Sequence, residues 1–171
     1  SAACENNNVE EGEACDDGDG NALGSDELTL GNPNNTGADN AGVGTVAWSN
    51  PAGVAGTDDQ YATVVPNGGT SHYLLITDFH TLDIPADAII VGIKPLIQRK
   101  SATDTITDVA VRLIKGGAVV GDSEPSETPW SSTEETLYYG GATDMWGTTW
   151  TRAEVLATDF GVAIAVTNAE T

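Results

Sequence analysis

TDVAVRLIKGGAVVGD, residues 107–122, contains the clearest structural signal in this chain. Two apolar runs flank a pair of glycines, and paired glycines supply the positive φ angles that a tight hairpin turn requires. In the first run, apolar residues occupy both alternating sets of positions, which is typical of a strand in the interior of a sheet. The stretch therefore predicts an antiparallel hairpin with strands at Thr107–Lys115 and Ala118–Asp122.

The chain after residue 44 continues in the same way, with short apolar runs separated by turn residues at the spacing of an all-β fold. A capping box at Thr151-Arg152-Ala153-Glu154 predicts one short helix over Arg152–Ala157. Together these elements predict an antiparallel β-sandwich of jelly-roll type over residues 45–171. Its further strands are expected at Gly44–Trp48, Gln60–Val65, His72–Phe79, Ala88–Gln98, Thr136–Tyr139 and Phe160–Thr167.

The charge of the chain excludes several partners. It carries 26 acidic and 6 basic residues, which gives a formal net charge of −20 and a pI near 4.1. Phosphate binding requires a basic surface, so nucleic acid is not expected as a partner. Anionic membranes repel such a chain, and the longest apolar stretch, Ala88–Ile93, is far below the ~20 residues of a membrane-spanning helix. We therefore expect no membrane partner either.

Residues 1–31 form an acidic extension with nine carboxylates and no basic residue, and residues 32–44 form a connector rich in glycine and asparagine. Cys4 and Cys15 lie in this extension without a third cysteine, so two thiols alone do not supply the four ligands of a structural zinc site. A disulfide and two free thiols are the remaining alternatives, and the glycine-rich, lysine-poor composition, which suits a secreted protein, favours the disulfide. Closing such a loop contributes about 3 kcal/mol.

Residues 4–18, CENNNVEEGEACDDG, resemble the opening of a cysteine-rich repeat of secreted myxobacterial proteins, although the later cysteines of that repeat are missing here. The resemblance implies a bacterial, exported protein and carries no activity with it. A second resemblance covers most of residues 45–167, to a β-sandwich domain of phage tail-associated and bacterial surface proteins. It implies a fold and little chemistry. It rests on AWSNP (47–51), Ile89–Arg99, VRLIKGG (111–117), YGG (139–141), DMWGTTWT (144–151) and DFGV (159–162).

Catalysis is not expected. The sequence has no nucleophile elbow, zinc-protease helix or phosphate-binding loop. Its two histidines, His72 and His80, could join a Ser–His–Asp triad only with a neighbour such as Asp78 or Asp83. Any aspartate-rich chain offers that coincidence, so both histidines are expected at strand ends or in loops.

Calcium is the expected metal, if one is bound. DGDGN at residues 17–21 places oxygen ligands at alternate positions, as a calcium loop does. By position in an EF-hand loop, the ligands would be the side chains of Asp17, Asp19 and Asn21, the carbonyl of Leu23 and a water held by Ser25. Ala22 replaces the usual glycine, and Glu27 stands one residue short of the bidentate position. The alternative is an ordinary acidic turn.

Three tryptophans in the last third of the chain, Trp130, Trp146 and Trp150, could stack against sugar rings. The alternative, which is the more common arrangement, is that these bulky side chains fill the core.

Five of the six basic residues lie between positions 94 and 115. If Ala88–Gln98 pairs with Thr107–Lys115, then Lys94, Arg112 and Lys115 form a basic stripe on an acidic domain. Scattered solubility charges are the alternative. A stripe would suit docking of the acidic extension, from the same chain or from a neighbour.

Residues 26–30, DELTL, place Leu28 and Leu30 on one face of an extended segment. Such a segment is either the first strand of its own sheet or a strand added to a neighbouring subunit. In organisation, the chain resembles the non-catalytic subunits of bacterial extracellular fibres that assemble by donor-strand exchange. This resemblance implies a secreted or cell-surface subunit of a head-to-tail homopolymer. The alternative function is a carbohydrate- or receptor-binding module of a phage tail or secreted protein.

Overall fold

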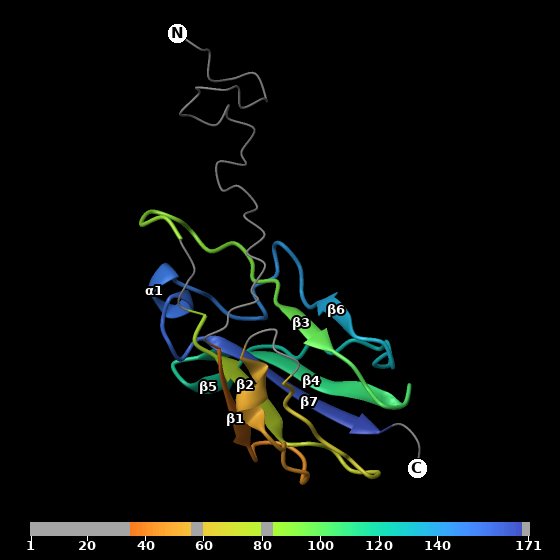
Figure 1. Cartoon of the computed structure of the whole chain (residues 1–171). Coiled ribbons are helices and arrows are strands. Elements are labelled where there is room, and N and C mark those ends of the chain that lie inside the picture. Colours follow the sequence, from red (N-terminus) through yellow and green to blue (C-terminus); the bar gives the residue numbers. More distant parts are fainter. Residues whose placement is uncertain (1–34, 56–59, 80–83, 169–171) are drawn as a thin grey trace.

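The structure, a computed structural model, describes residues 35–55, 60–79 and 84–168. These residues form an all-β fold with one short α-helix, as expected, and a short 3₁₀ helix. Two antiparallel sheets are present, one of five strands in the order β1-β2-β7-β4-β5 and one of two strands, β3-β6 (Figure 1). The strands are β1 (Thr36–Asn40), β2 (Tyr73–Thr77), β3 (Leu96–Arg99), β4 (Ile106–Lys115), β5 (Ala118–Val120), β6 (Glu135–Tyr138) and β7 (Gly161–Asn168).

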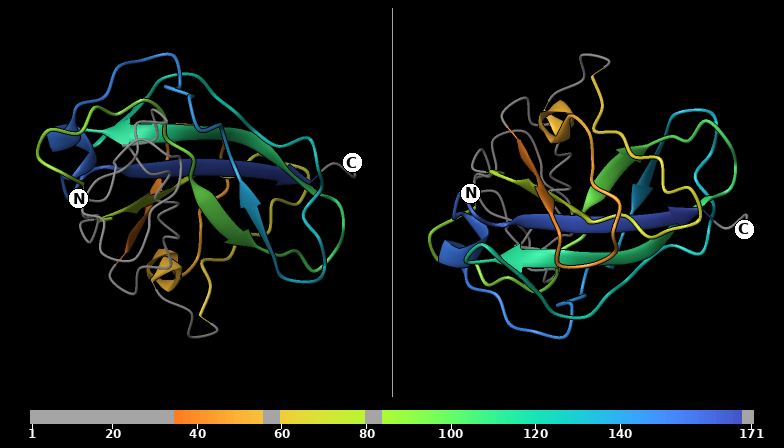
Figure 2. Two further views of the ribbon diagram at one scale, coloured as in Figure 1. Left: turned by 90° about the horizontal axis from the view of Figure 1, so that it is seen from above. Right: turned by 90° about the horizontal axis from the view of Figure 1, so that it is seen from below.

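The two-stranded sheet lies over one face of the five-stranded sheet, and its strands cross the long strands β4 and β7 obliquely (Figure 2). The residue pairing in the large sheet shows why one of its faces is apolar. Leu74 pairs with Ile164 and Ile164 with Val111, so apolar side chains of three strands point the same way. This row and the neighbouring pair Leu113 and Val162 belong to one buried cluster. The core therefore lies between the two sheets.

The hairpin at Lys115-Gly116-Gly117-Ala118 is confirmed. β4 and β5 pair in register across it, with Lys115 opposite Ala118. Gly116 and Gly117 have φ angles of 58° and 73°, the left-handed values that a two-residue turn of this kind requires. The expectation that Thr107–Lys115 lies in the interior of a sheet is also confirmed, because β4 lies between β7 and β5.

Three expected strands are wrong in whole or in part. Gly44–Trp48 and Gln60–Val65 contribute only isolated bridges, at Val46 and Thr63. Of Ala88–Gln98, only the last residues are a strand, because β3 begins at Leu96. Pro95 precedes it and has no N–H to donate to a ladder.

β1 was missed because it lies within the predicted connector, residues 32–44. It is an edge strand with mostly exposed side chains, so it lacks the apolar alternation that marks an inner strand. Gly37 is required by packing, since a Cβ atom there would lie 1.8 Å from the carbonyl oxygen of Pro51. Pro51 begins the 3₁₀ helix η1 (Pro51–Val54), which therefore packs directly on the β1 backbone.

The helix α1 (Arg152–Val155) begins at the predicted capping box and ends two residues earlier than expected. The Thr151 hydroxyl accepts a hydrogen bond from the Glu154 N–H at 3.3 Å, and the Glu154 carboxylate accepts one from the Thr151 N–H at 2.8 Å. The bond from the Thr151 N–H, and then the one that the Thr151 hydroxyl donates to the same carboxylate at 2.9 Å, lower the pKa of Glu154.

We predict that Gly117→Ala lowers the free energy of unfolding by about 1 kcal/mol, because a Cβ atom is strained at its φ of 73°. A Cβ there would meet nothing within 4 Å, so the cost is conformational and not steric. Gly141→Ala is the control, since its nearest atom would be at 3.9 Å and its φ lies outside the left-handed region. Equilibrium urea unfolding of both variants checks this, and equal stabilities would contradict it.

Candidate functional site

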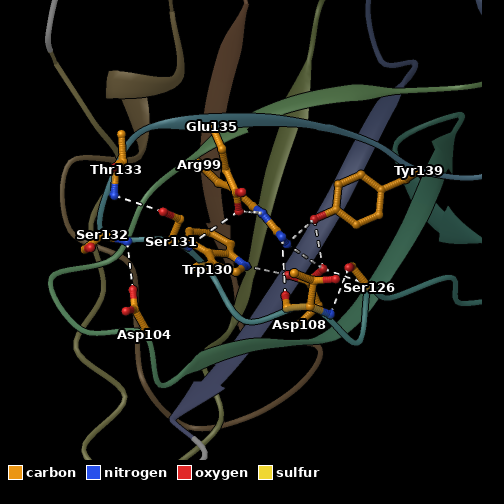
Figure 3. Close-up of polar contacts among 11 residues, drawn as sticks. Arg99, Asp104, Asp108, Ser126, Trp130, Ser131, Ser132, Thr133, Glu135 and Tyr139 are labelled. Atoms are coloured by element: carbon orange, nitrogen blue, oxygen red, sulfur yellow. Dashed lines mark hydrogen bonds and ion pairs between the residues drawn. The ribbon is translucent and has the colours of Figure 1, made fainter.

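The most elaborate polar site surrounds Arg99 on β3, whose side chain is fully buried (Figure 3). Its Nε donates to the Glu135 carboxylate at 2.9 Å. Its Nη1 donates to Asp108 Oδ2 at 3.2 Å and to the Tyr139 hydroxyl at 2.9 Å. Its Nη2 donates to the Thr128 carbonyl at 3.3 Å. One guanidinium thus connects β3, β6 and β4.

Asp108, the other charge of this network, is equally buried and equally well bonded. Its carboxylate accepts hydrogen bonds from the Trp130 indole at 2.7 Å, the Tyr139 hydroxyl at 2.8 Å and the Ser126 N–H at 3.0 Å. Burial and the nearby Asp108 charge raise the pKa of Tyr139, so its phenol stays protonated and donates. With its donors and acceptors occupied, this network is suited to joining the two sheets and not to binding a substrate.

Sequence reasoning missed this network, although one signal was present. In Leu96-Ile97-Gln98-Arg99, arginine occupies the same alternating set as the buried Ile97. An arginine on the apolar face of a strand needs a buried carboxylate partner.

The opposite face of the two-stranded sheet is exposed, and we call it the β3–β6 outer face. Lys94 Nζ lies 3.8 Å from the ring centroid of Tyr138, and Lys100 Nζ lies 4.0 Å from that of Tyr61. The Tyr61 hydroxyl donates to Glu134, which lowers the pKa of that carboxyl. The face consists of Lys94, Leu96, Gln98, Lys100, Glu134, Thr136 and Tyr138.

The basic stripe was predicted on the premise that Ala88–Gln98 pairs with Thr107–Lys115. This premise is wrong, because β3 pairs with β6 and not with β4. Lys94 therefore lies on the small sheet, whereas Arg112 and Lys115 lie on the large one. Arg112 Nη1 donates to the Gly121 carbonyl at 2.7 Å. Lys115 pairs with Glu154 at 3.4 Å and lies over the Trp150 ring. Both residues on the large sheet thus have partners within their own domain.

Two of the three tryptophans considered as sugar-binding candidates are core residues, which is the arrangement that the sequence favours. Trp146 is 0% exposed and donates to the Ile93 carbonyl at 2.8 Å. Trp150 is 6% exposed and packs edge-on against Phe160. Neither ring offers a face to a sugar, so for these two residues core packing is confirmed and the sugar-binding alternative is wrong. Trp130 is half-buried and its indole N–H is bonded to Asp108.

His72 has a carboxylate partner that the sequence did not indicate. Its Nδ1 lies 2.8 Å from Asp39 Oδ2 on β1, and Asp39 Oδ1 accepts from the Trp48 N–H at 2.8 Å. The bond to His72 and then that to Trp48 lower the pKa of Asp39. The neighbouring Ser71 hydroxyl donates to the His72 carbonyl and accepts from the Val166 N–H of β7. Ser71 and His72 thus bond to β7 and to Asp39 of β1, and these bonds help to hold the strands together.

Several predicted residues lie outside the described part of the chain. These are the calcium ligands Asp17, Asp19, Asn21, Leu23, Ser25 and Glu27, the cysteines Cys4 and Cys15, the leucines Leu28 and Leu30, and His80 with Asp83. Among the residues that the structure does describe, no three histidine, cysteine or acidic side chains are grouped as metal ligands would be. None of the helices in that part is long and apolar enough to cross a membrane.

No protein-family model matches this chain, and neither does any curated protein or solved structure.

We predict that Arg99→Met destabilises the fold by about 3–5 kcal/mol, because it leaves the fully buried carboxylate of Asp108 without a cation and removes the ion-pair partner of Glu135, whose side chain is 32% exposed. Lys115→Met is the matched control. It breaks an ion pair whose side chains are 22% and 36% exposed, so a loss of about 0–1 kcal/mol is expected. Thermal and urea unfolding measure both. Similar losses of stability for the two variants would show that Arg99 does not hold the two sheets together as described.

The Asp39–His72 contact predicts a pH dependence. Because the folded-state pKa of Asp39 lies below its ordinary value of 3.8, its contribution to stability is present above pH 3.8 and is lost as the pH falls through the folded pKa. The stability difference between the wild type and Asp39→Asn should therefore be constant at higher pH and shrink in acid. Urea midpoints over a pH series measure it, with Asp87→Asn in an exposed turn as the control. A difference that does not change in acid would contradict the assignment.

Proposed function

We propose that this chain is a non-catalytic structural subunit of an extracellular, self-assembling filament. In this proposal, the N-terminal extension of one copy adds a strand to the sheet of the next. The supporting observation is that β3 and β6 each have a strand partner on one side only, among the residues described. An unpaired strand edge is a ready template for another strand.

The unequal size of the two sheets supports strand addition at the small one. At about 4.8 Å per strand, five strands span about 19 Å between their outer axes, whereas two span about 5 Å. A two-stranded ladder is only marginally stable alone and gains from further strands. We propose that the architecture is a β-sandwich of jelly-roll type, with the small sheet as the layer that an added strand would extend.

The extension is proposed to carry the remaining features of the assembly. A disulfide between Cys4 and Cys15 would close its first part, and calcium bound at Asp17 and Asp19 would reduce the mutual repulsion of its carboxylates. Secretion from a bacterial cell or display on its surface suits both features.

A second candidate function is a carbohydrate- or receptor-binding module. The β3–β6 outer face favours it, because Tyr138 is 38% exposed there and Ile89 and Val91, on the segment leading to β3, are 73% and 52% exposed. Exposed apolar and aromatic side chains of this kind mark interaction surfaces. Under this alternative the ligand would contact Tyr138 and not Trp146 or Trp150.

The first test is the assembly state of the whole chain, by negative-stain electron microscopy and light scattering, with calcium and with chelator. We expect filaments from the whole chain, fewer in chelator, and monomers when residues 1–31 are deleted. Leu28→Asp/Leu30→Asp should act like the deletion, whereas Thr29→Asp, on the opposite set of side chains, is the control. Uniform monomers of the whole chain in both conditions would overturn the proposal. Binding on a glycan array would then support the second function.

A further inference from the structure

We infer that the acceptor for the N-terminal extension is the edge of β3, where Lys94 and Lys100 attract the carboxylates of a second copy. This inference rests on the proposed function and names the surface at which it operates. It follows from which cations of the domain are exposed and lack a carboxylate in ion-pair contact among the described residues, from where those cations lie, and from the charge of the only long segment outside the described domain.

The six basic residues of the chain all lie in the described domain and differ in their partners. Arg99 and Lys115 are paired with carboxylates. Arg112 and Arg152 donate to backbone carbonyls at 2.7 and 2.8 Å. Lys94 and Lys100 form no ion pair with a carboxylate of the described residues and instead lie over tyrosine rings. Arg112 and Arg152 keep their charge but are half-buried, whereas Lys94 and Lys100 are exposed. After the hydrogen bond from Tyr61, the charge of Lys100 also helps to lower the pKa of Glu134. In a chain of net charge −20, these two ammonium groups are therefore the exposed cations that an anionic partner can reach.

Lys94 and Lys100 are placed to receive one extended segment. They flank β3 and share an alternating set with Leu96 and Gln98, so they lie on the outer face of the small sheet. Six residues of extended chain separate them by about 20 Å. Stacking on Tyr138 and Tyr61 keeps both ammonium groups on this face, which reduces the entropy lost when a partner binds.

The extension complements this edge in charge and in pattern. It has nine carboxylates and no basic residue, and it precedes β1, so up to 35 residues of chain can extend from the domain. If residues 26–30 are extended in the complex, Leu28 and Leu30 share one face, and Glu27 and Thr29 share the other. If the leucines face the core of the acceptor, Glu27 points to the outer face, where the lysines lie. Opposite charges on neighbouring strands stabilise their pairing.

Carbodiimide crosslinking in a mixture of ¹⁴N- and ¹⁵N-labelled whole chains tests this directly. The reagent joins a lysine amine to a carboxylate in contact with it, and mass spectrometry shows whether the two peptides come from different copies. We expect mixed-isotope links from Lys94 and Lys100 to carboxylates of residues 1–31. Lys115, the third lysine, is the internal control and should link to Glu154 within one copy. Mixed links from Lys115 instead, or links within one copy alone at Lys94 and Lys100, would overturn the inference.

Lys94→Gln/Lys100→Gln should raise the concentration at which half the protein assembles by about fivefold, because two exposed charge pairs are lost. Ala47→Glu/Ala118→Glu changes the net charge equally at exposed positions on neither strand of the small sheet and should assemble more readily than the lysine variant. If wild type and both variants assemble alike, the acceptor is elsewhere and the proposed function stands. If the wild type does not assemble at all, both the proposed function and this inference are overturned.

Discussion

The position of the small sheet depends on the charge of Arg99, which is neutralised inside the molecule by Asp108 and Glu135. Asp108 belongs to β4 of the large sheet, and Glu135 belongs to β6 of the small one. A buried charge that loses its partner is strongly destabilising, so neither sheet can shift without breaking this contact. Apolar packing between the sheets is non-directional, whereas the guanidinium fixes one relative position.

The two faces of β3 therefore differ in chemistry. Toward the core it presents Ile97 and Arg99, and away from the core it presents Gln98 between two lysines. Because the buried face is held rigidly, the lysines and the edge between them are held in place as well. A partner that binds this edge would meet a preorganised surface, which lowers the entropic cost of association.

The sequence predicted the elements with strong local signals and missed those made by tertiary contacts. The Gly116-Gly117 turn and the Thr151 capping box are local, and both were found where expected. β1 was missed because its exposed residues owe their strand conformation to pairing with β2. The pairing of β3 with β6 joins residues about forty positions apart, which no local pattern encodes. For the candidate site, the sequence showed the cluster of basic residues between positions 94 and 115. It did not show which of these lysines remain available to an anionic partner, because that depends on the pairing of β3 with β6.

The strand order also bears on how the chain is made. β7 is the last described strand in sequence and the middle strand of the large sheet, so it alone joins the β1–β2 pair to the β4–β5 hairpin. During synthesis those two units have no common sheet until residues 161–168 leave the ribosome. Such late, long-range pairing slows folding and leaves apolar strands exposed meanwhile. A chain truncated before residue 161 would hold the β1–β2 pair and the β4–β5 hairpin as separate units, and quality control should remove it.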